Sequence, residues 1–186
     1  MQLNIYIISH PIIKLLSTSL LCSNINKIVK FNNYKLCSLL LIYEASRKSI
    51  AIQPIYLKKF QSLTELYLIN KYQKYYLFTN VIENYMILTD IKLIIPDIFI
   101  LDIKQNNSIK LNQHIIKNTK YNNKIIIFEK ILSTSKILEI IDNLTINYKI
   151  PIENINIISI ACYNYVLNII GKQYSNLKIY TTKIIQ

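Results

Sequence analysis

Short apolar segments alternate with segments of helical periodicity along most of this chain. Near-continuous runs of isoleucine, leucine, phenylalanine and tyrosine predict buried strands, and they occur at residues 76–79, 98–103, 124–128, 156–161 and 177–181. Elsewhere apolar residues recur every three or four positions, which predicts helices at residues 31–48, 81–95, 136–149 and 163–170. This alternation indicates an α/β fold in which helices cover both faces of a parallel sheet.

Two breaker residues and one polar segment interrupt this pattern. Pro96 follows the helical segment 81–95 as a stop signal, and Gly171, the only glycine, is placed for a helix C-terminal cap. Residues 104–123 are polar and rich in asparagine, so we expect a long loop or an irregular hairpin there. No repeat or linker divides the chain. We therefore expect a single domain over residues 1–186.

The turn after the strand at 124–128 is the best candidate for a site, because parallel sheets bind ligands at the carboxyl ends of their strands. Glu129 leaves that strand, and Ser133, Thr134 and Ser135 open the next helix. The carboxylate can accept hydrogen bonds from sugar hydroxyls, while the hydroxyls and a helix N-terminus can hold a phosphate. The same residues also fit a simpler structure, in which Ser133 or Thr134 caps the helix and Glu129 faces water.

The composition narrows the classes of partner. The chain is 52% hydrophobic, which argues against disorder, and its net charge of +12 first suggests a polyanion such as nucleic acid. However, the lysines are scattered singly and Arg47 is the only arginine, the residue best suited to bidentate phosphate contacts. We therefore expect a solvated basic surface, with RNA binding as the less favoured alternative. No run of about 18 apolar residues is free of polar ones, so we expect no membrane partner.

Residue usage suggests where such a chain is encoded. Isoleucine, asparagine, lysine and tyrosine dominate, and these residues have AT-rich codons, whereas glycine, proline, alanine and arginine are scarce. We expect an AT-rich genome, such as that of an organelle or a reduced bacterium, and mutational drift as one source of the charge. Cys22, Cys37 and Cys162 lie far apart and outside any CxxC spacing, so no metal site is expected.

Four segments, in order, resemble the uracil phosphoribosyltransferases. Residues 10–13, HPII, resemble the family's His-Pro-Leu-Val, and residues 40–47, LLIYEASR, resemble its Leu-Leu-x-Tyr-Glu-Ala-Thr-Arg helix. Residues 125–144 resemble its strand, its Asp-Pro-Met-Leu-Ala-Thr-Gly-Gly-Ser loop and the next helix, and residues 177–182, LKIYTT, resemble Val-x-Ile-Tyr-Thr-Ala. The resemblance covers nearly the whole chain. It implies a phosphoribosyltransferase type I-like parallel sheet with flanking helices and an N-terminal helical arm.

The same resemblance implies a reaction and a binding loop. The family transfers phosphoribose from phosphoribosyl pyrophosphate (PRPP) to uracil, which gives UMP and pyrophosphate in pyrimidine salvage. By resemblance, PRPP would be held at Glu129, Ser133, Thr134, Ser135 and Lys136, with no metal site of the protein's own and with Mg²⁺ accompanying PRPP if the protein is active. Both glycines of the family's loop are missing here, although they let backbone N–H groups approach phosphate.

Two further departures concern pyrophosphate and uracil. The family's pyrophosphate loop, Pro-x-Leu-Arg-Ala-Gly, corresponds here to a stretch with Ile82, Glu83 and Asn84, so isoleucine replaces the arginine and a carboxylate would repel pyrophosphate. The family's uracil-reading segment would follow Thr182, and the sequence ends at Gln186, which implies a truncated C-terminus.

We therefore expect a degenerate uracil phosphoribosyltransferase homologue with weak activity or none and with no permanently bound cofactor. The alternative is a non-catalytic protein that binds a nucleotide or a phosphorylated sugar, or that regulates a partner. The expected ligand is PRPP or a phosphorylated sugar, and the sequence is compatible with a homo-oligomer. We expect a soluble protein that is encoded in a plastid and located there. The alternative location is a bacterial cytoplasm.

Overall fold

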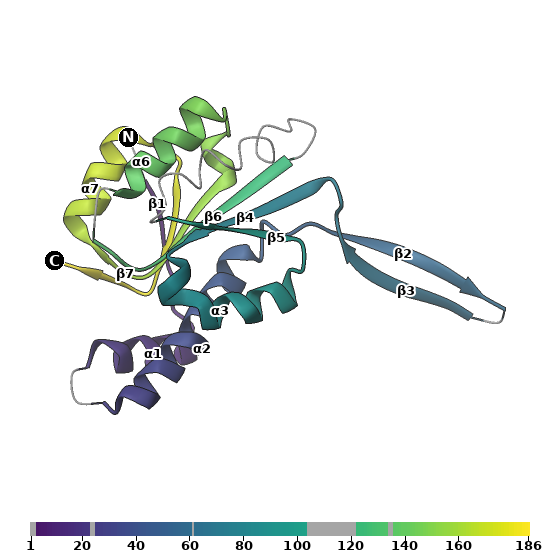
Figure 1. Cartoon of the computed structure of the whole chain (residues 1–186), viewed down its shortest axis with the longest axis horizontal. Helices are drawn as coiled ribbons and strands as arrows, with labels where there is room; N and C mark the ends of the chain where they lie inside the picture. The colour runs from purple at the N-terminus through teal and green to yellow at the C-terminus, as the bar shows by residue number, and fades with distance from the viewer. Residues whose placement is uncertain (1–2, 23–24, 61, 104–121, 134–135) are drawn as a thin grey trace.

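A parallel sheet of seven strands forms the centre of the protein (Figure 1). The computed structural model describes residues 3–22, 25–60, 62–103, 122–133 and 136–186. The sheet runs in the order β1-β8-β7-β6-β4-β5, with β9 also paired to β7, and each of these pairings is parallel. The strands are β1 (Asn4–Ile7), β4 (Gln73–Thr79), β5 (Ile98–Asp102), β6 (Asn122–Leu132), β7 (Ile155–Tyr163), β8 (Lys178–Thr181) and β9 (Lys183–Ile185).

Helices cover both faces of this sheet. One face carries α1 (Pro11–Leu21), α2 (Lys27–Ser46) and α3 (Val81–Ile94). The other carries α6 (Lys136–Asp142), a π-helical turn (Asn143–Asn147) and α7 (Asn164–Gln173), with a short 3-10 helix (Ile152–Asn154) before β7. This is the predicted α/β arrangement, a phosphoribosyltransferase type I-like sheet with flanking helices and an N-terminal pair of helices. No helix of the described chain is long and apolar enough to cross a membrane.

Successive residues of the central strands enter two different cores. On β4, Tyr75 and Leu77 pack with α1, α2 and α3, whereas Tyr76 and Phe78 pack with α6 and α7. Both sets are essentially solvent-free. Side chains alternate across a strand, so a strand between two helical layers is apolar on both sides. This explains the continuous apolar runs in the sequence.

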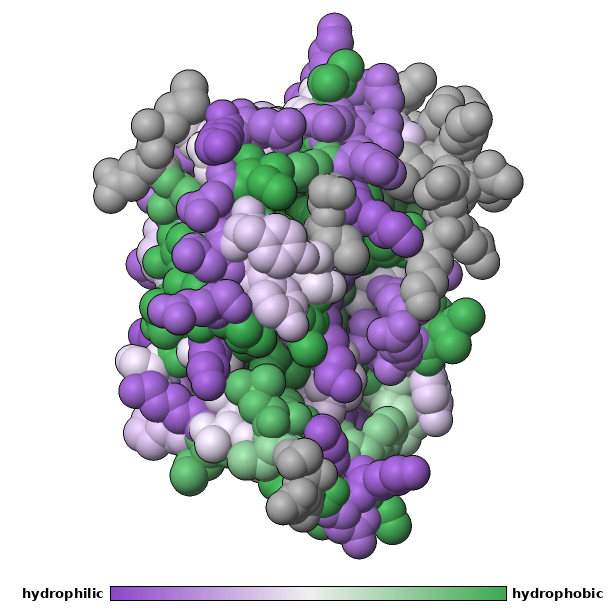
Figure 2. Space-filling view, turned by 90° about the vertical axis from the view of Figure 1, so that its left-hand side faces the viewer, coloured by the Kyte–Doolittle hydropathy of each residue, from purple (hydrophilic) through white to green (hydrophobic). Residues whose placement is uncertain are grey.

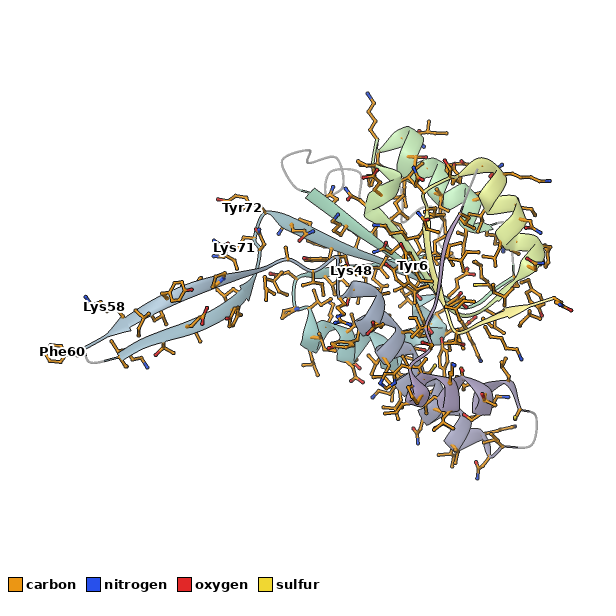
Figure 3. All side chains as sticks on the ribbon, turned by 180° about the vertical axis from the view of Figure 1, so that it is seen from behind. Tyr6, Lys48, Lys58, Phe60, Lys71 and Tyr72 are labelled. Atoms are coloured by element: carbon orange, nitrogen blue, oxygen red, sulfur yellow. The ribbon has the colours of Figure 1, made fainter. Side chains whose placement is uncertain are left out.

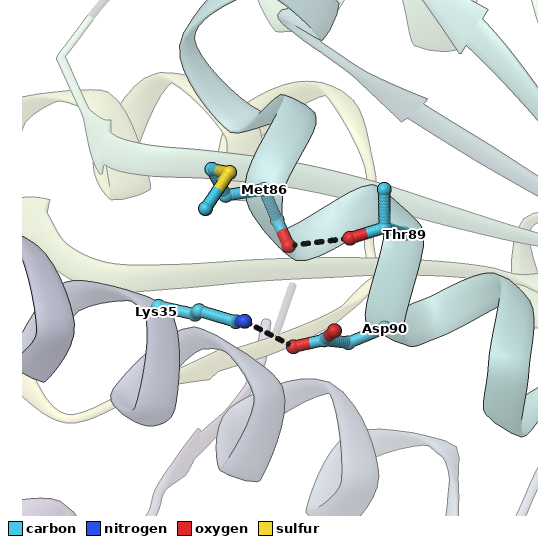
Figure 4. A network of polar contacts seen from close by, with 4 residues as sticks. All are labelled: Lys35, Met86, Thr89 and Asp90. Atoms are coloured by element: carbon cyan, nitrogen blue, oxygen red, sulfur yellow. Dashed lines mark hydrogen bonds and ion pairs between the residues drawn. The ribbon is translucent and has the colours of Figure 1, made fainter.

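An ion pair joins α2 to α3 on the face of the sheet that both helices cover. Lys35 of α2 lies 2.8 Å from the Asp90 carboxylate of α3, and within α3 the hydroxyl of the preceding residue, Thr89, donates to the Met86 carbonyl (Figure 4). The ion pair is about one-third exposed, so it contributes little to stability. The apolar side chains beneath it, among them Leu41 and Ile87, hold these helices on the sheet.

A β-hairpin projects from the body, and the sequence patterns did not predict it. It consists of β2 (Ile52–Lys59) and β3 (Ser62–Ile69), which pair antiparallel with each other and with no strand of the main sheet (Figure 1). Every residue of β2 is exposed. Its apolar residues therefore do not serve the core of this chain.

Several predicted boundaries need correction. Glu129 lies within β6, because the ladder with β7 continues to Leu132. Gly171 lies inside α7, where it faces Leu3, and the helix ends instead with the Tyr174 N–H bonded to the Ile170 carbonyl at 2.8 Å. A further strand, β9, which the sequence pattern did not predict, follows the predicted strand at 177–181. The predicted loop at 104–123 lies almost entirely outside the described residues.

Candidate functional site

A cavity of about 710 Å³ lies at the carboxyl ends of β4, β5 and β6. Its described wall comes from the start of α3, the end of β5, the end of β6, and α6 with the π-helical turn that follows it. The described lining residues are Asn80, Glu83, Asn84, Ile103, Phe128, Glu129, Lys130, Ile131, Ser133, Lys136, Glu139, Ile140 and Asn143. The volume is in the range of a small-molecule site, and the location is where parallel sheets bind ligands.

The unequal lengths of neighbouring strands create this cavity. The β4–β6 ladder ends at the pair of Thr79 with Phe128, whereas the β6–β7 ladder continues to Leu132 with Cys162. Beyond Phe128, therefore, β6 has lost its neighbour on the β4 side. Glu129 follows directly and lines the space that β4 leaves.

Glu129 has the most perturbed carboxyl group of the described site. Its pKa rises from the ordinary 4.5 to about 7, chiefly because of burial and also because of the nearby Glu83, while Lys136 acts to lower it. At neutral pH the group is thus divided between its acid and its carboxylate. It can donate a hydrogen bond in one form and accept hydrogen bonds in the other, which suits a ligand with hydroxyl groups.

A buried chain of hydrogen bonds fixes the start of α3 beside Glu129. The Tyr34 hydroxyl donates to Asn84 Oδ1, and Asn84 Nδ2 donates to Thr79 Oγ1 at 2.8 Å. Thr79 Oγ1 in turn donates to the Phe128 carbonyl at 2.9 Å. Asn84 is only 2% exposed. The chain joins α2, α3, β4 and β6, so Asn84 holds the wall of the cavity in place.

Asn80 offers the cavity an unused acceptor. Its Oδ1 atom is buried and has no hydrogen-bond partner among the described residues, and the residue lines the cavity. A buried polar atom without a partner costs free energy. A ligand that donates a hydrogen bond to this atom would recover that cost.

The charges around the cavity are mixed, with a small acidic excess among the described residues. Glu83, Glu129 and Glu139 face Lys130 and Lys136, so the lining is one charge negative when all five are ionised. Both lysines are exposed. The Lys130 ammonium lies 5.0 Å from the centre of the Tyr34 ring, which holds it beside the site.

The structure brings together most of the residues that the sequence singled out. Glu129, Ser133 and Lys136 of the loop line the same cavity as Glu83 and Asn84. The Ser133 carbonyl accepts a hydrogen bond from the hydroxyl of Tyr165 on α7.

The remaining residues that the sequence predicted for the site lie either outside the cavity or outside the described residues. Ile82 is 77% exposed and does not line the cavity, while Thr134 and Ser135 lie outside the described residues. The sequence interpretation overlooked Asn80 and Glu139 as lining residues. Asn80 directly follows a predicted strand, so the strand-end rule could have found it, whereas Glu139 depends on where α6 packs. Among the described residues, no group of three or more His, Cys, Asp or Glu side chains could hold a metal ion.

Comparison with known proteins supports the fold and leaves the family open. No protein-family model matches the chain, and no curated protein matches it. Among solved structures, the AQ2163 protein from Aquifex aeolicus superposes with a TM-score of 0.71 at 14% identity. The superposition covers 97% of this chain and 86% of that protein. At this identity the likeness shows a shared fold only.

Proposed function

We propose that this chain is a divergent homologue of the uracil phosphoribosyltransferases that retains a ligand cavity and has little or no transferase activity. One observation carries the proposal. The PRPP loop and the pyrophosphate loop are assigned by resemblance to two segments about 45 residues apart, represented by Glu129 and Glu83, and these segments line one cavity. The cavity also lies at the strand ends that suit such a ligand.

The charges in the cavity support weak transfer or none. PRPP carries several negative charges, and leaving pyrophosphate must be stabilised by cations fixed around it. Here Glu83 lines the cavity, and Ile82, which replaces the arginine of the family, is exposed outside it. Lys130 and Lys136 are the cationic side chains of the described lining. They are point charges without the planar fork of arginine, and Mg²⁺ brought by PRPP would have to supply the remainder.

A smaller anion fits the same wall better. A nucleoside monophosphate or a phosphorylated sugar carries one phosphate, which one or both of the exposed lysines could contact. Its hydroxyl groups would meet Glu129 and the unused Asn80 acceptor. This is the non-catalytic alternative, and it differs from the transferase in the reaction rather than in the place of binding.

Two measurements test the proposal. With labelled uracil, PRPP and Mg²⁺, the purified protein is expected to form UMP no faster than a buffer blank. Turnover near one per second, which is ordinary for enzymes, would refute the loss of activity. Calorimetry is expected to show that ribose 5-phosphate binds. A Glu129→Lys variant is expected to change the dissociation constant, because the substitution reverses the net charge of the cavity lining. If ribose 5-phosphate, UMP and PRPP all fail to bind at millimolar concentration, the proposed ligand site is wrong.

RNA binding receives less support from the surface. On the face shown in Figure 2, hydrophobic side chains interrupt the hydrophilic ones over most of the visible described surface. A single-strand binding groove instead combines a continuous basic track with stacking aromatic side chains.

The preference for residues with AT-rich codons supports a plastid-encoded protein as part of the proposal. Detecting the gene product in isolated plastids would test that location.

A further inference from the structure

One wall of the cavity offers hydrogen-bond acceptors to a ligand. Asn80 and Glu83 belong to the start of α3, and Glu129 of β6 lies close enough to Glu83 for the two carboxylates to repel each other. The Asn80 Oδ1 atom and the Glu129 carboxylate have no hydrogen bond or ion pair among the described residues. These three residues, called the acceptor wall from here on, therefore favour a ligand group that donates hydrogen bonds.

The neighbouring groups at the start of α3 do not change this preference. Both ends of the Asn84 side-chain amide are already bonded within the protein. The Val81 N–H donates to Asp102 Oδ1 at 3.5 Å, so the carboxylates of Asp102 and Glu83 both lie at the N-terminus of α3. A helix N-terminus attracts a phosphate, but here two carboxylates would repel it. The acceptor wall is therefore unsuited to the phosphate end of a ligand.

The cations of the cavity lie at its exposed rim. Lys130 and Lys136 are the cationic side chains of the described lining, and both are exposed. Figure 3 places Lys58 and Lys71 on and beside the projecting hairpin, which leads into the amino end of β4, whereas the cavity lies at the carboxyl end. The large positive charge of the chain therefore does not make the acceptor wall basic. A phosphate, with up to two negative charges and three acceptor oxygens, suits the two lysines of the rim.

An ammonium group complements the acceptor wall better than a hydroxyl group does. An ammonium group donates three hydrogen bonds and accepts none, whereas a hydroxyl group donates one and also presents lone pairs. Its positive charge favours the ionised form of Glu129, whose pKa is raised by burial and by Glu83. Hydrogen bonds to ionised groups are also about twice as strong as those between neutral groups. The wall therefore favours a cationic group over a neutral one.

We propose that the cavity binds a phosphorylated amino sugar, with its ammonium group against the acceptor wall and its phosphate at Lys130 and Lys136. This proposal rests on the ligand cavity proposed above and specifies the class of ligand more narrowly. The volume of about 710 Å³ is sufficient for such a molecule, and the half-buried Ile103 and Ile131 can contact its carbon ring. The ammonium group also reduces the negative charge that the ligand brings to a lining with an acidic excess.

Calorimetry with two matched sugars tests the role of the amine. Glucosamine 6-phosphate and glucose 6-phosphate differ in one group, which is an ammonium in the first and a hydroxyl in the second. At about pH 7.5, glucosamine 6-phosphate is expected to bind about 10-fold more tightly or better, as for a charged hydrogen bond. Equal affinities would overturn the amine while leaving the phosphate-binding cavity in place. If neither sugar binds at millimolar concentration and ribose 5-phosphate also fails, the cavity proposal itself is wrong.

Variants locate the amine and the phosphate separately. Glu129→Gln should bring the affinities of the two sugars close together, because glutamine keeps the shape of the side chain and removes its charge. Glu153→Gln is the matched control, since the exposed Glu153 precedes β7 at the opposite end of the sheet. Lys130→Ala with Lys136→Ala should weaken both sugars alike and keep their affinity ratio. A ratio that Glu129→Gln leaves unchanged, or that Glu153→Gln lowers equally, would overturn the proposal.

The pH dependence of the affinity ratio gives an independent readout. The charged groups of the described lining around Glu129 are Glu83 from α3, Lys130 from β6, and Lys136 and Glu139 from α6. Since the pKa of Glu129 is about 7, acid removes the charge that faces the ammonium group. The ratio should fall about 3-fold or more between about pH 7.5 and about pH 5.5, and the shared phosphate cancels from it. A ratio that rises in acid would contradict the assigned contact.

Magnesium is the competing cation for the acceptor wall, because carboxylate oxygens also bind Mg²⁺. Titration with magnesium chloride alone is expected to give no heat that Glu129→Gln removes. Asn80→Ala is expected to weaken glucosamine 6-phosphate more than glucose 6-phosphate, since it deletes an acceptor of the ammonium group, and circular dichroism would verify its fold. Binding of Mg²⁺ alone that depends on Glu129, together with equal affinities for the two sugars, would show that the wall serves a metal ion and would overturn the proposal.

Discussion

Replacing Glu129 with glutamine should stabilise the protein at alkaline pH and not at acidic pH. Burial raises the pKa of Glu129 from 4.5 to about 7 in the folded protein. The folded chain therefore binds the proton more tightly than the unfolded chain, so the free energy of unfolding falls as pH rises from about 4.5 through about 7. Glutamine keeps the shape of the protonated acid and cannot ionise. Its advantage over glutamate must appear across this pH range.

The size of the effect follows from the shift. A rise from 4.5 to about 7 corresponds to at most ~3.4 kcal/mol at pH above 7. The side chain is only partly buried, so water screens part of this cost, and we expect about 1–2 kcal/mol for Glu129→Gln. At typical urea dependence for a small protein, this moves the unfolding midpoint by about 0.5–1 M.

The assay is urea unfolding followed by far-UV circular dichroism at about pH 5 and about pH 8. Glu139→Gln is the matched control, since Glu139 lines the same cavity but is exposed. At about pH 8 it removes one negative charge, as Glu129→Gln does, but it relieves no burial, so its effect should be small at both pH values. Equal stabilisation of Glu129→Gln at both pH values, or destabilisation at about pH 8, would refute the assigned burial of the carboxylate.

Three further outcomes are expected. Asn84→Ala should lower the free energy of unfolding by about 2–3 kcal/mol, because it leaves buried partners on both sides without a hydrogen bond; the exposed Asn147→Ala should cost under ~0.5 kcal/mol in the same urea titration. The double variant Lys130→Ala, Lys136→Ala should weaken ribose 5-phosphate binding in calorimetry, and the lost affinity should be the salt-dependent part, since exposed charges are screened over about 8 Å at physiological ionic strength; unchanged affinity and salt dependence would show that both lysines only face solvent. Glu83→Gln should tighten PRPP binding about 3- to 10-fold by removing a negative charge from the cavity, and weaker binding would show that Glu83 holds the ligand or its Mg²⁺.

The apolar runs and helical periods of the sequence were sufficient to predict the α/β class and most core elements. Continuous apolar runs mark strands covered on both sides, which is why β4, β5, β6 and β7 were found. The rule that ligands bind at strand ends then located the cavity, because Glu129 is the first residue of β6 beyond its pairing with β4. These features depend on local chain chemistry and a simple packing rule.

Other features depended on contacts between distant segments. The end of β6 is set by its ladder with β7, and the burial of Asn84 is set by Tyr34 and Thr79, which lie on two other elements. The raised pKa of Glu129 likewise comes from burial and from Glu83. No local sequence pattern predicts these contacts, because each of them joins residues that lie far apart in the chain.

The β2–β3 hairpin shows the division most clearly. Apart from Ile69 at its root, its apolar residues do not pack against the core of this chain and follow no simple strand period, and so the sequence did not mark it as a hairpin. The sequence determined which positions carry the apolar side chains that a solvent-free core needs. Only the tertiary structure decided which of them are buried, because burial requires a second surface, and the described chain provides one for Ile69 at the root of the hairpin but not for the exposed apolar residues beyond it.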